Sequence, residues 1–261
     1  MVKRGRPTKQ NAEVEFDSSS IQLFRGSDLT FSDSLFEPMT TGTELDVILS
    51  TEGGVMPGTN MIVAGGPGSG KSTIVLDMLS KFTQQGLKVL YVSGEMDEIA
   101  HYKYCKRIPH INCVQTLFLK NYSNTVRETL EFIFNEGYDV IAIDSIAEVL
   151  EMYKDAYRTT ENAAEIWFLG LQDKNKKGGN SKNYYTTFVN IQQMTKGGDF
   201  VGSNKLKHMM EAYCYLERSK DGLERSLHFE KNRDCDKDFK VYFSIYKGGI
   251  HYSYGNANQN D

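Results

Sequence analysis

Residues 65–72 constrain the fold of this chain more than any other segment, because they match the pattern G-x-x-x-x-G-K-[ST] at every required position. The pattern binds phosphate only where a buried strand leads into it and an amphipathic helix leads out of it. A short apolar run at residues 61–64 predicts the strand, and apolar side chains at helical spacing between residues 74 and 82 predict the helix. Glycines let backbone N–H groups turn inward, and the helix N-terminus adds the positive end of its dipole. The sequence therefore predicts a phosphate-binding loop, or P-loop.

The P-loop pattern also assigns chemistry to individual residues. Lys71 is expected to neutralise the β- and γ-phosphates of a nucleotide, and the Ser72 hydroxyl is expected to ligate Mg²⁺. ATP and Mg²⁺ are therefore the predicted cofactors. The residues expected to contact them are Gly65, Gly66, Pro67, Gly68, Ser69, Gly70, Lys71, Ser72 and Thr73.

Two carboxylates are candidates for the rest of the site. Asp144 ends an apolar strand that begins at residue 138, so its side chain is expected at the C-terminal edge of the sheet, where open α/β folds bind ligands. There Asp144 would hold Mg²⁺, directly or through water, and capping of the following turn is the alternative role. Glu95 follows a strand predicted at residues 89–92 and would orient or deprotonate the attacking water. A solvated glutamate is the alternative at that position.

The order of the predicted elements indicates an α/β fold. Gly86 ends the P-loop helix, and a strand at residues 89–92 follows. A second helix opens at Thr125, with Glu128 at capping-box spacing, and leads to the strand at residues 138–143. This alternation is typical of a mostly parallel, twisted sheet with helices on both faces. In the C-terminal third, glycine-containing turns separate further strand-like segments and predict an antiparallel extension of the sheet. These segments are residues 212–218, 226–232, 239–246 and 250–254.

Composition is that of a globular protein of the cytoplasm. Of 261 residues, 39% are hydrophobic and 25% are charged, and no apolar run reaches the length of about 18 residues that a membrane span needs. The four cysteines are scattered without CxxC spacing, so neither a zinc site nor a disulfide framework is expected. The net charge is −4, so any contact with DNA has to come from local basic segments.

One such segment lies at the N-terminus. Residues 1–20 are polar, begin with cationic side chains and end in a serine run, which predicts a flexible basic arm. Residues 3–7 also resemble an AT-hook, in which Arg4 and Arg6 would enter the minor groove of A·T-rich DNA. A solvated basic tail is the alternative, and the shortness of the segment favours it.

Beyond the P-loop, the chain resembles the RecA-like ATPases, and most closely the RadA/Sms branch of bacterial recombination proteins. The resemblance runs from about residue 45 to residue 252 and extends to the motors of DnaB-type helicases. Its most specific segments are Gly-Gly-Val-Met-Pro-Gly at residues 53–58 and Lys-Asn-Arg at residues 231–233, because these lie outside the motifs that every P-loop protein shares. The other matching segments are residues 92–95, 143–146, 194–196 and 206–209.

The resemblance implies a nucleotide sensor and a DNA-binding loop. Gln193 falls where the family places a polar side chain that senses the γ-phosphate. RadA proteins usually carry His there, whereas RecA and the hexameric helicase motors carry Gln. Residues 195–205 would form the DNA-binding loop, with Lys196 and Lys205 at phosphates. Without the resemblance, an ordinary solvated turn is the simpler interpretation of this loop.

The resemblance also implies a residue pair that acts on a neighbouring subunit. Lys231 and Arg233 match the first and third positions of the family motif Lys-Asn-Arg-Phe-Gly. In related motors, basic residues at these positions reach the neighbour's γ-phosphate and act like an arginine finger. Asp234 and Cys235 replace Phe-Gly here, so the backbone after Arg233 departs from the family pattern. A polar strand edge is the alternative interpretation.

Two parts of RadA proteins have no counterpart in this sequence: a four-cysteine zinc module before the core and a Lon-protease-like domain after it. The resemblance therefore implies a stripped-down core. We expect a RecA-like ATPase domain at residues 21–254, between the basic arm at residues 1–20 and a polar tail at residues 255–261.

The function that the resemblance implies is an ATP-dependent DNA-binding motor of the RecA/RadA type, acting in recombination, repair or replication. Such a protein is an ATPase stimulated by DNA, works on single-stranded or branched DNA, and forms a homo-oligomeric ring or filament. Two alternatives stay open. One is a replicative-type hexameric helicase motor, which Gln193 favours. The other is a nucleotide-dependent protein switch or an assembly factor of the helicase-loader kind.

Overall fold

The computed structural model describes residue 19 and residues 21–176, 185–194, 204–219, 222, 224–235 and 239–256, without the side chains of residues 204, 205, 255 and 256. The chain divides into two compact units, Met1–Ser32 and Asp33–Asp261. Several predicted DNA contacts lie outside the described residues and stay predictions. They are Arg4, Arg6, Lys196 and the side chain of Lys205.

The described part of the first unit contains one short 3₁₀ turn, η2 (Gly26–Asp28). The backbone N–H of Arg25 donates a hydrogen bond to Asp28 Oδ2 at 2.9 Å, which closes the turn. Apolar side chains on either side of it, including Leu23 and Phe24, are exposed.

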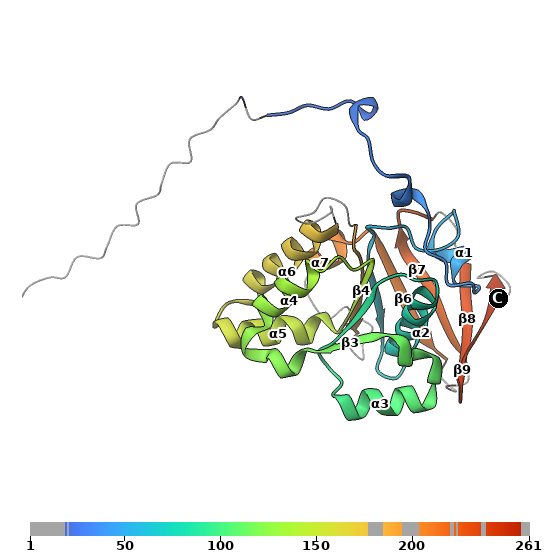
Figure 1. The fold of residues 1–261 in the computed structure, drawn as a ribbon. Helices are drawn as coiled ribbons and strands as arrows, with labels where there is room; N and C mark the ends of the chain where they lie inside the picture. The colour runs from blue at the N-terminus through green and yellow to red at the C-terminus, as the bar shows by residue number, and fades with distance from the viewer. Residues whose placement is uncertain are drawn as a thin grey trace, which may run out of the picture. The chain divides into compact units, whose positions relative to one another are not determined.

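The second unit is built on one nine-stranded sheet in the order β3-β2-β4-β5-β1-β6-β7-β8-β9 (Figure 1). All neighbours from β3 to β6 are parallel, and β6 to β9 are antiparallel. The strands are β1 (Asn60–Gly65), β2 (Val89–Ser93), β3 (Gln115–Phe118), β4 (Val140–Asp144), β5 (Thr187–Gln193), β6 (Ala212–Arg218), β7 (Arg225–Asn232), β8 (Phe239–Tyr246) and β9 (Gly249–Asn256).

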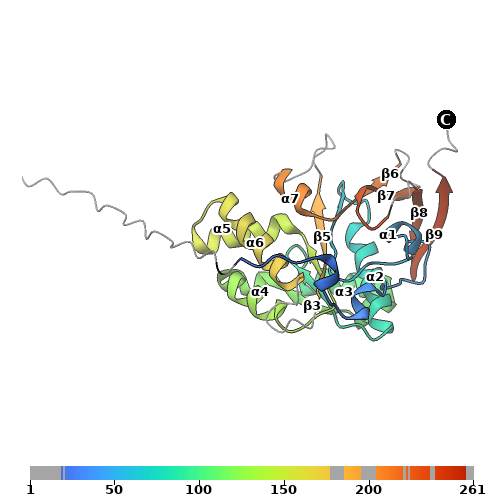
Figure 2. The same ribbon diagram turned by 90° about the horizontal axis from the view of Figure 1, so that it is seen from above.

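Helices cover both faces of the parallel part of the sheet (Figures 1 and 2). The α-helices are α1 (Asp46–Leu49), α2 (Lys71–Gln84), α3 (Glu98–Arg107), α4 (Val126–Phe134), α5 (Ile146–Tyr157), α6 (Glu161–Lys176) and α7 (Asn204–Met209). The 3₁₀ segments of this unit are η3 (Asp33–Phe36), η4 (Pro109–Cys113) and η5 (Leu119–Thr125). No helix within the described residues combines the length and the apolar character that crossing a membrane would take.

The two faces bury separate apolar cores. On one face, Phe82 of α2 packs with Ile111 of η4 and Tyr91 of β2. On the other face, Leu130 of α4 and Phe168 of α6 belong to a core that also holds side chains of α5 and the sheet. Burial on both faces explains why β1, β2 and β4 are fully buried apolar runs and not alternating strands.

The predicted fold class is confirmed: a mostly parallel sheet carries helices on both faces and an antiparallel C-terminal extension. The four predicted C-terminal strands correspond to β6, β7, β8 and β9.

The predicted capping box at Thr125 is wrong, although the helix exists. Thr125 has φ −131° and ψ 29° as the last residue of η5, and its side chain makes no capping hydrogen bond. Glu128 instead accepts a hydrogen bond at 2.5 Å from the Tyr157 hydroxyl of α5. A tertiary contact from the neighbouring helix therefore takes the carboxylate that the local pattern assigns to the helix start.

Candidate functional site

The strand order brings the predicted site residues to one edge of the sheet. Strands β2, β4, β5 and β1 are parallel neighbours, so their C-terminal ends meet at the same edge. In register, Gly65 at the end of β1 pairs with Gln193 at the end of β5. Asp144 at the end of β4 pairs with Ser93 at the end of β2, two residues before Glu95. The P-loop, both carboxylates and the predicted sensor are therefore neighbours in space, although they span residues 65–193.

The P-loop holds its lysine by the backbone of the loop. Lys71 is the first residue of α2, and its ammonium Nζ donates to the carbonyl oxygens of Gly65 at 2.8 Å and Gly66 at 3.0 Å. Burial lowers the pKa of Lys71, and the charges of Asp144 and Glu95 oppose that shift. The carbonyl oxygens are neutral groups with only a partial negative charge, so they do not neutralise the ammonium. The Lys71 cation can therefore still attract a phosphate.

Two glycines of the loop are required by neighbouring strands. A Cβ atom on Gly65 would lie 2.6 Å from the carbonyl oxygen of Leu216 in β6. Gly70 has φ +107°, and a Cβ atom there would lie 3.0 Å from Ile245 Cδ1 in β8. The antiparallel extension therefore packs directly against the loop, which explains why bulkier residues cannot replace these glycines.

Asp144 is held by two hydroxyl groups. Ser72 Oγ donates a hydrogen bond to Asp144 Oδ2 at 2.5 Å, and the Tyr91 hydroxyl donates to the same oxygen. Asp144 is only 2% exposed; burial raises its pKa, and the bonds from Ser72 and Tyr91 oppose this. Hydrogen bonds to the charged form keep a buried carboxylate available as an anion.

These oxygens fit a magnesium ion. Mg²⁺ prefers hard oxygen ligands and is usually held by one or two protein groups together with water and substrate phosphates. Ser72 and Asp144 supply a hydroxyl and a carboxylate at hydrogen-bond distance from each other. The described residues contain no cluster of three or more His, Cys, Asp or Glu that could hold a metal ion by protein ligands alone. Ser72 and Asp144 would leave the remaining positions around a bound Mg²⁺ to water and to phosphate oxygens.

Tyr91 is a site residue that the sequence analysis missed. It pairs with Ala142 in β4, two residues before Asp144, so the tyrosine and aspartate side chains share one face of the sheet. The Tyr91 side chain is fully buried, and burial followed by the charge of Asp144 raises its pKa well above its usual range. The only sign of this role in the sequence is the Tyr91 hydroxyl within the apolar run at residues 89–92.

We expect Tyr91→Phe to raise the Mg²⁺ concentration that nucleotide binding requires, because the substitution removes a donor to Asp144 and keeps the packed ring. Loss of a hydrogen bond to a metal ligand typically lowers metal affinity by about 10- to 100-fold. The measurement is binding of a fluorescent ATP analogue, titrated with Mg²⁺. Tyr153→Phe is the matched control, since Tyr153 is buried in the core of the other face. Equal Mg²⁺ requirements in both variants would remove Tyr91 from the site.

Glu95 and Gln193 meet at the open edge of the sheet. Gln193 Nε2 lies 3.4 Å from Glu95 Oε1 and 3.5 Å from Oε2. The backbone around the glutamate is fixed, because the N–H groups of Gly94 and Glu95 donate to the carbonyl oxygen of Asp144 at 2.6 and 3.2 Å. Lys120 Nζ also donates to the carbonyl oxygen of Glu95 at 2.8 Å. The carboxylate of Glu95 is exposed and faces the edge on which the P-loop opens.

Lys231 and Arg233 lie at the opposite edge of the sheet. Lys231 pairs with Tyr213 at the start of β6, whereas Gly65 pairs with Leu216 near the end of that strand. At about 3.3 Å per residue, three residues of β6 separate the two levels by about 10 Å along the strand. Lys231 Nζ donates to the carbonyl oxygens of His208 in α7 at 3.2 Å and of Met210, just after α7, at 2.5 Å. The Lys231 side chain is therefore engaged at the sheet edge away from the P-loop of its own chain, and Arg233 follows two residues later. The predicted role of both residues at a neighbour's site stays a prediction.

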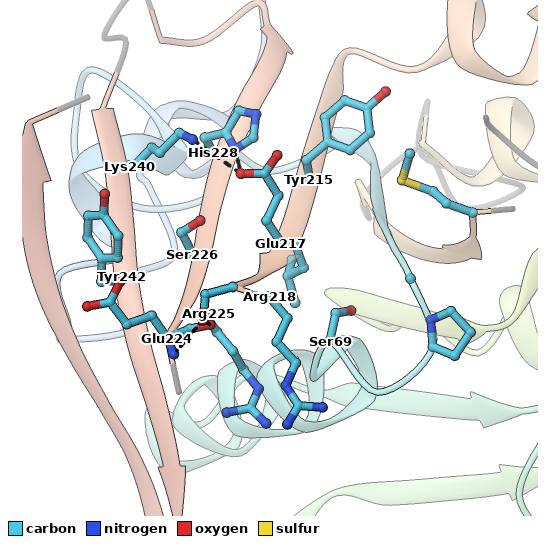
Figure 3. Close-up of a pocket in the computed structure, with 15 residues that line it drawn as sticks. Ser69, Tyr215, Glu217, Arg218, Glu224, Arg225, Ser226, His228, Lys240 and Tyr242 are labelled. Carbon is cyan, nitrogen blue, oxygen red and sulfur yellow. Dashed lines mark hydrogen bonds and ion pairs between the residues drawn. The ribbon is translucent and has the colours of Figure 1, made fainter. Parts of the chain in front are cut away.

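A cavity of about 820 Å³ lies beside the P-loop, between the loop and the antiparallel extension (Figure 3). No motif in the sequence predicts this cavity. Its walls are Gly66, Pro67, Ser69, Met194, Tyr215, Leu216, Glu217, Arg218, Ser219, Glu224, Arg225, Ser226, His228, Lys240 and Tyr242.

Curated relatives of the chain carry the name DNA repair protein RadA. The protein from Campylobacter jejuni is 30% identical over 199 residues, which cover 74% of this chain and 41% of that protein. The protein from Streptococcus pneumoniae is 26% identical over 246 residues, covering 92% and 54%. The protein from Mycobacterium tuberculosis is 27% identical over 217 residues, covering 82% and 43%. The chain spans about half the length of these relatives or less, and no family model matches it.

Solved structures show the same fold at lower identity. The flagellar accessory protein FlaH from Methanocaldococcus jannaschii superposes with a TM-score of 0.64 at 15% identity, covering 84% of this chain and 100% of that chain. The RadB recombinase superposes with a TM-score of 0.60 at 20% identity, covering 81% and 98%. The predicted resemblance to RadA and the predicted RecA-like fold are confirmed.

Proposed function

We propose that this chain, which has a RecA-like core related to that of RadA proteins, binds ATP with Mg²⁺ at the P-loop and hydrolyses it. One observation carries the proposal: three groups of side chains lie at the same edge of the sheet. They are Lys71 in the P-loop, the hydrogen-bonded pair Ser72 and Asp144, and the pair Glu95 and Gln193. A phosphate cradle, a metal-ligand pair and a carboxylate open to water are the parts that nucleotide hydrolysis needs.

Each residue has a defined task in this reaction. Lys71 places a cation against the transferred phosphate, and the Ser72–Asp144 pair would hold Mg²⁺. When bound, Mg²⁺ neutralises the charge that develops on the phosphate oxygens. Glu95 accepts a proton from the attacking water, and Gln193 orients that carboxylate through its amide. Gln193 also begins the connection to residues 195–205, so its contact to Glu95 links the site to the proposed DNA-binding loop.

The proposed partner is DNA, single-stranded or branched, and the proposed assembly is a homo-oligomeric ring or filament. The names of the RadA relatives support a role in recombination or repair. The placement of Lys231 and Arg233 at the edge away from their own P-loop supports an active site shared between copies. The arm at residues 1–20, the ATPase domain at residues 21–254 and the tail at residues 255–261 remain the proposed domain organisation.

The test of this function is the ATPase rate of the purified chain with and without single-stranded DNA, together with its mass in solution. A DNA-stimulated rate in an oligomer supports the motor. The alternative favoured by Gln193, a replicative-type helicase motor, would in addition displace a strand from a forked duplex. The RecA-like fold also occurs in a flagellar accessory protein, so a protein switch or assembly factor is the third reading. Slow turnover unchanged by DNA would favour that reading.

We expect Glu95→Gln to leave ATP binding intact and to slow hydrolysis by about 100-fold or more, because it removes the proton acceptor without changing the side-chain shape. The measurement is single-turnover hydrolysis beside equilibrium ATP binding. Glu98→Gln is the matched control: it lies three residues further along, and its carboxylate accepts a hydrogen bond from Asn121 outside the site. A loss of only a few-fold in Glu95→Gln would show that another group accepts the proton.

A further inference from the structure

Two arginines, Arg218 and Arg225, line the cavity beside the P-loop, and a third, Arg107, lies close enough for its charge to act on Arg225. Arg107 is the last residue of α3, Arg218 is the last of β6, and Arg225 is the first of β7. Arg218 pairs directly with Arg225 across the two strands, and Arg225 pairs with Phe243 of β8. Paired residues share a face, and Phe243 belongs to the core on the α2 side. We call these three residues the arginine cluster.

The arginine cluster brings like charges together without a matching anion. Like charges directly opposite each other in an antiparallel pair are destabilising. Burial, and then the charges of Arg218 and Arg107, lower the pKa of Arg225. No ion pair joins any of the three to a carboxylate among the residues that the structure describes.

The hydrogen-bond donors of the cluster are only partly used. Arg225 Nε is buried and has no hydrogen-bond partner within the described part of the chain. Arg218 Nε donates to a neutral group, the carbonyl oxygen of Gly222, at 3.2 Å. Glu217 lines the same cavity, but its carboxylate lies 3.2 Å from Lys240 Nζ and 3.9 Å from His228 Nδ1. Glu217, which precedes Arg218 in the chain, is therefore engaged with other cations, and Glu224, which precedes Arg225, forms no ion pair with an arginine among the described residues.

Two arginines of the cluster lie close to the P-loop. Arg218 and Arg225 line one cavity together with Ser69 of the P-loop. In Figure 3, both guanidinium groups point the same way, away from the side chains of Glu217, His228 and Lys240. Phe243, which is paired with Arg225, also lies within 3.3 Å of the position that a Cβ atom on Gly70 would take. An anion bound by these two guanidinium groups would therefore lie on the α2 side of the strands, close to the start of α2.

We propose that the arginine cluster is an anion site that binds a phosphate group, separately from the phosphates held by Lys71. Guanidinium groups bind phosphate through two parallel N–H···O bonds, and an anion between them would turn the repulsion of Arg218 and Arg225 into attraction. The phosphate can belong to a nucleotide, to a nucleic-acid backbone or to a free phosphate ion, and the experiment separates these sources. The site requires no hydrolysis, so it stands independently of the proposed ATPase activity.

The test compares Arg225→Gln with unchanged protein by thermal unfolding, with inorganic phosphate and pyrophosphate as probes against chloride at equal ionic strength. Both proteins also carry Lys71→Ala, which weakens binding at the P-loop. Without phosphate, Arg225→Gln is expected to raise Tm by about 2 °C, because it removes a repulsive charge. Phosphate is expected to raise the Tm of the protein that keeps Arg225 and to leave the Tm of Arg225→Gln unchanged. Lys240→Gln is the control, since Lys240 lines the same cavity but pairs with Glu217.

A second experiment identifies the source of the phosphate. In proteins that keep Lys71, with and without Arg225→Gln, the affinities for ATP and for a short single-stranded oligonucleotide are measured. The ligand whose affinity falls about tenfold in Arg225→Gln is the natural source, since hydrogen bonds to a charged group contribute about that much. If neither affinity falls while the phosphate-dependent Tm shift does, the ligand is free phosphate. A lower Tm in Arg225→Gln without phosphate, or an unchanged response to both phosphate probes, would overturn the proposal and leave the cluster a structural feature.

Discussion

Lys71→Ala is expected to abolish ATP turnover. The ammonium is held at the centre of the P-loop by the carbonyl oxygens of Gly65 and Gly66, so no other described cation takes the same place in the loop. Its removal leaves the β- and γ-phosphates without their main counter-ion in a partly buried site, where charge is poorly screened. The measurement is steady-state ATP hydrolysis at saturating Mg²⁺, beside nucleotide binding by fluorescence.

The variant is expected to stay folded, because Lys71 makes hydrogen bonds only to loop carbonyls and no buried ion pair is broken. Lys81→Ala is the matched control on the same helix. Lys81 lies ten residues further along α2, about 15 Å from Lys71 along the helix axis, and its Nζ lies 3.7 Å from Asp77 Oδ2. Its loss is therefore expected to leave turnover unchanged. Near-normal hydrolysis by folded Lys71→Ala protein would remove the P-loop assignment and, with it, the proposed function.

The parallel half of the fold was predictable because its strands are buried on both faces. Continuous apolar runs at β1, β2 and β4 stand out in the sequence, and β1 and β4 end in the predicted site residues Gly65 and Asp144. Strand β3 was missed because it is an edge strand of four residues with only partial burial. Helix α3 was missed because Cys105 is its single buried residue, which leaves no apolar stripe to detect.

The candidate site was predictable only as far as its residues sit in local motifs. The P-loop and Asp144 have fixed spacing to a strand, whereas Tyr91 acquires its role through cross-strand register with β4. The arginine cluster depends on register as well, since Arg218 and Arg225 meet only through the antiparallel pairing of β6 with β7. Thr125 and Glu128 show the converse: a local motif was present, but Tyr157 from another helix took its carboxylate.

Arg233→Ala is expected to bind ATP normally and to lose about 10³-fold in turnover, the scale of a missing arginine finger. Arg233 is exposed, and its backbone N–H donates to the carbonyl oxygen of Glu211 at 3.2 Å, so removal of the side chain leaves this backbone contact in place. Arg127→Ala is the matched control, because Arg127 is an exposed arginine that pairs with Glu131 of its own helix. It is expected to keep full turnover.

The decisive measurement is turnover in mixtures of Arg233→Ala and Lys71→Ala proteins. Each variant is expected to be inactive alone. In a mixed assembly, however, the intact P-loop of an Arg233→Ala copy can face the intact Arg233 of a Lys71→Ala copy. Recovered turnover can then arise only at a site shared between two copies, because Arg233 lies at the sheet edge away from the P-loop of its own chain. A protein that works as a monomer gives no recovery at any mixing ratio. That result, with both variants folded and the unchanged protein active, would reject the action of Arg233 on a neighbour and remove the main structural support for a ring or filament.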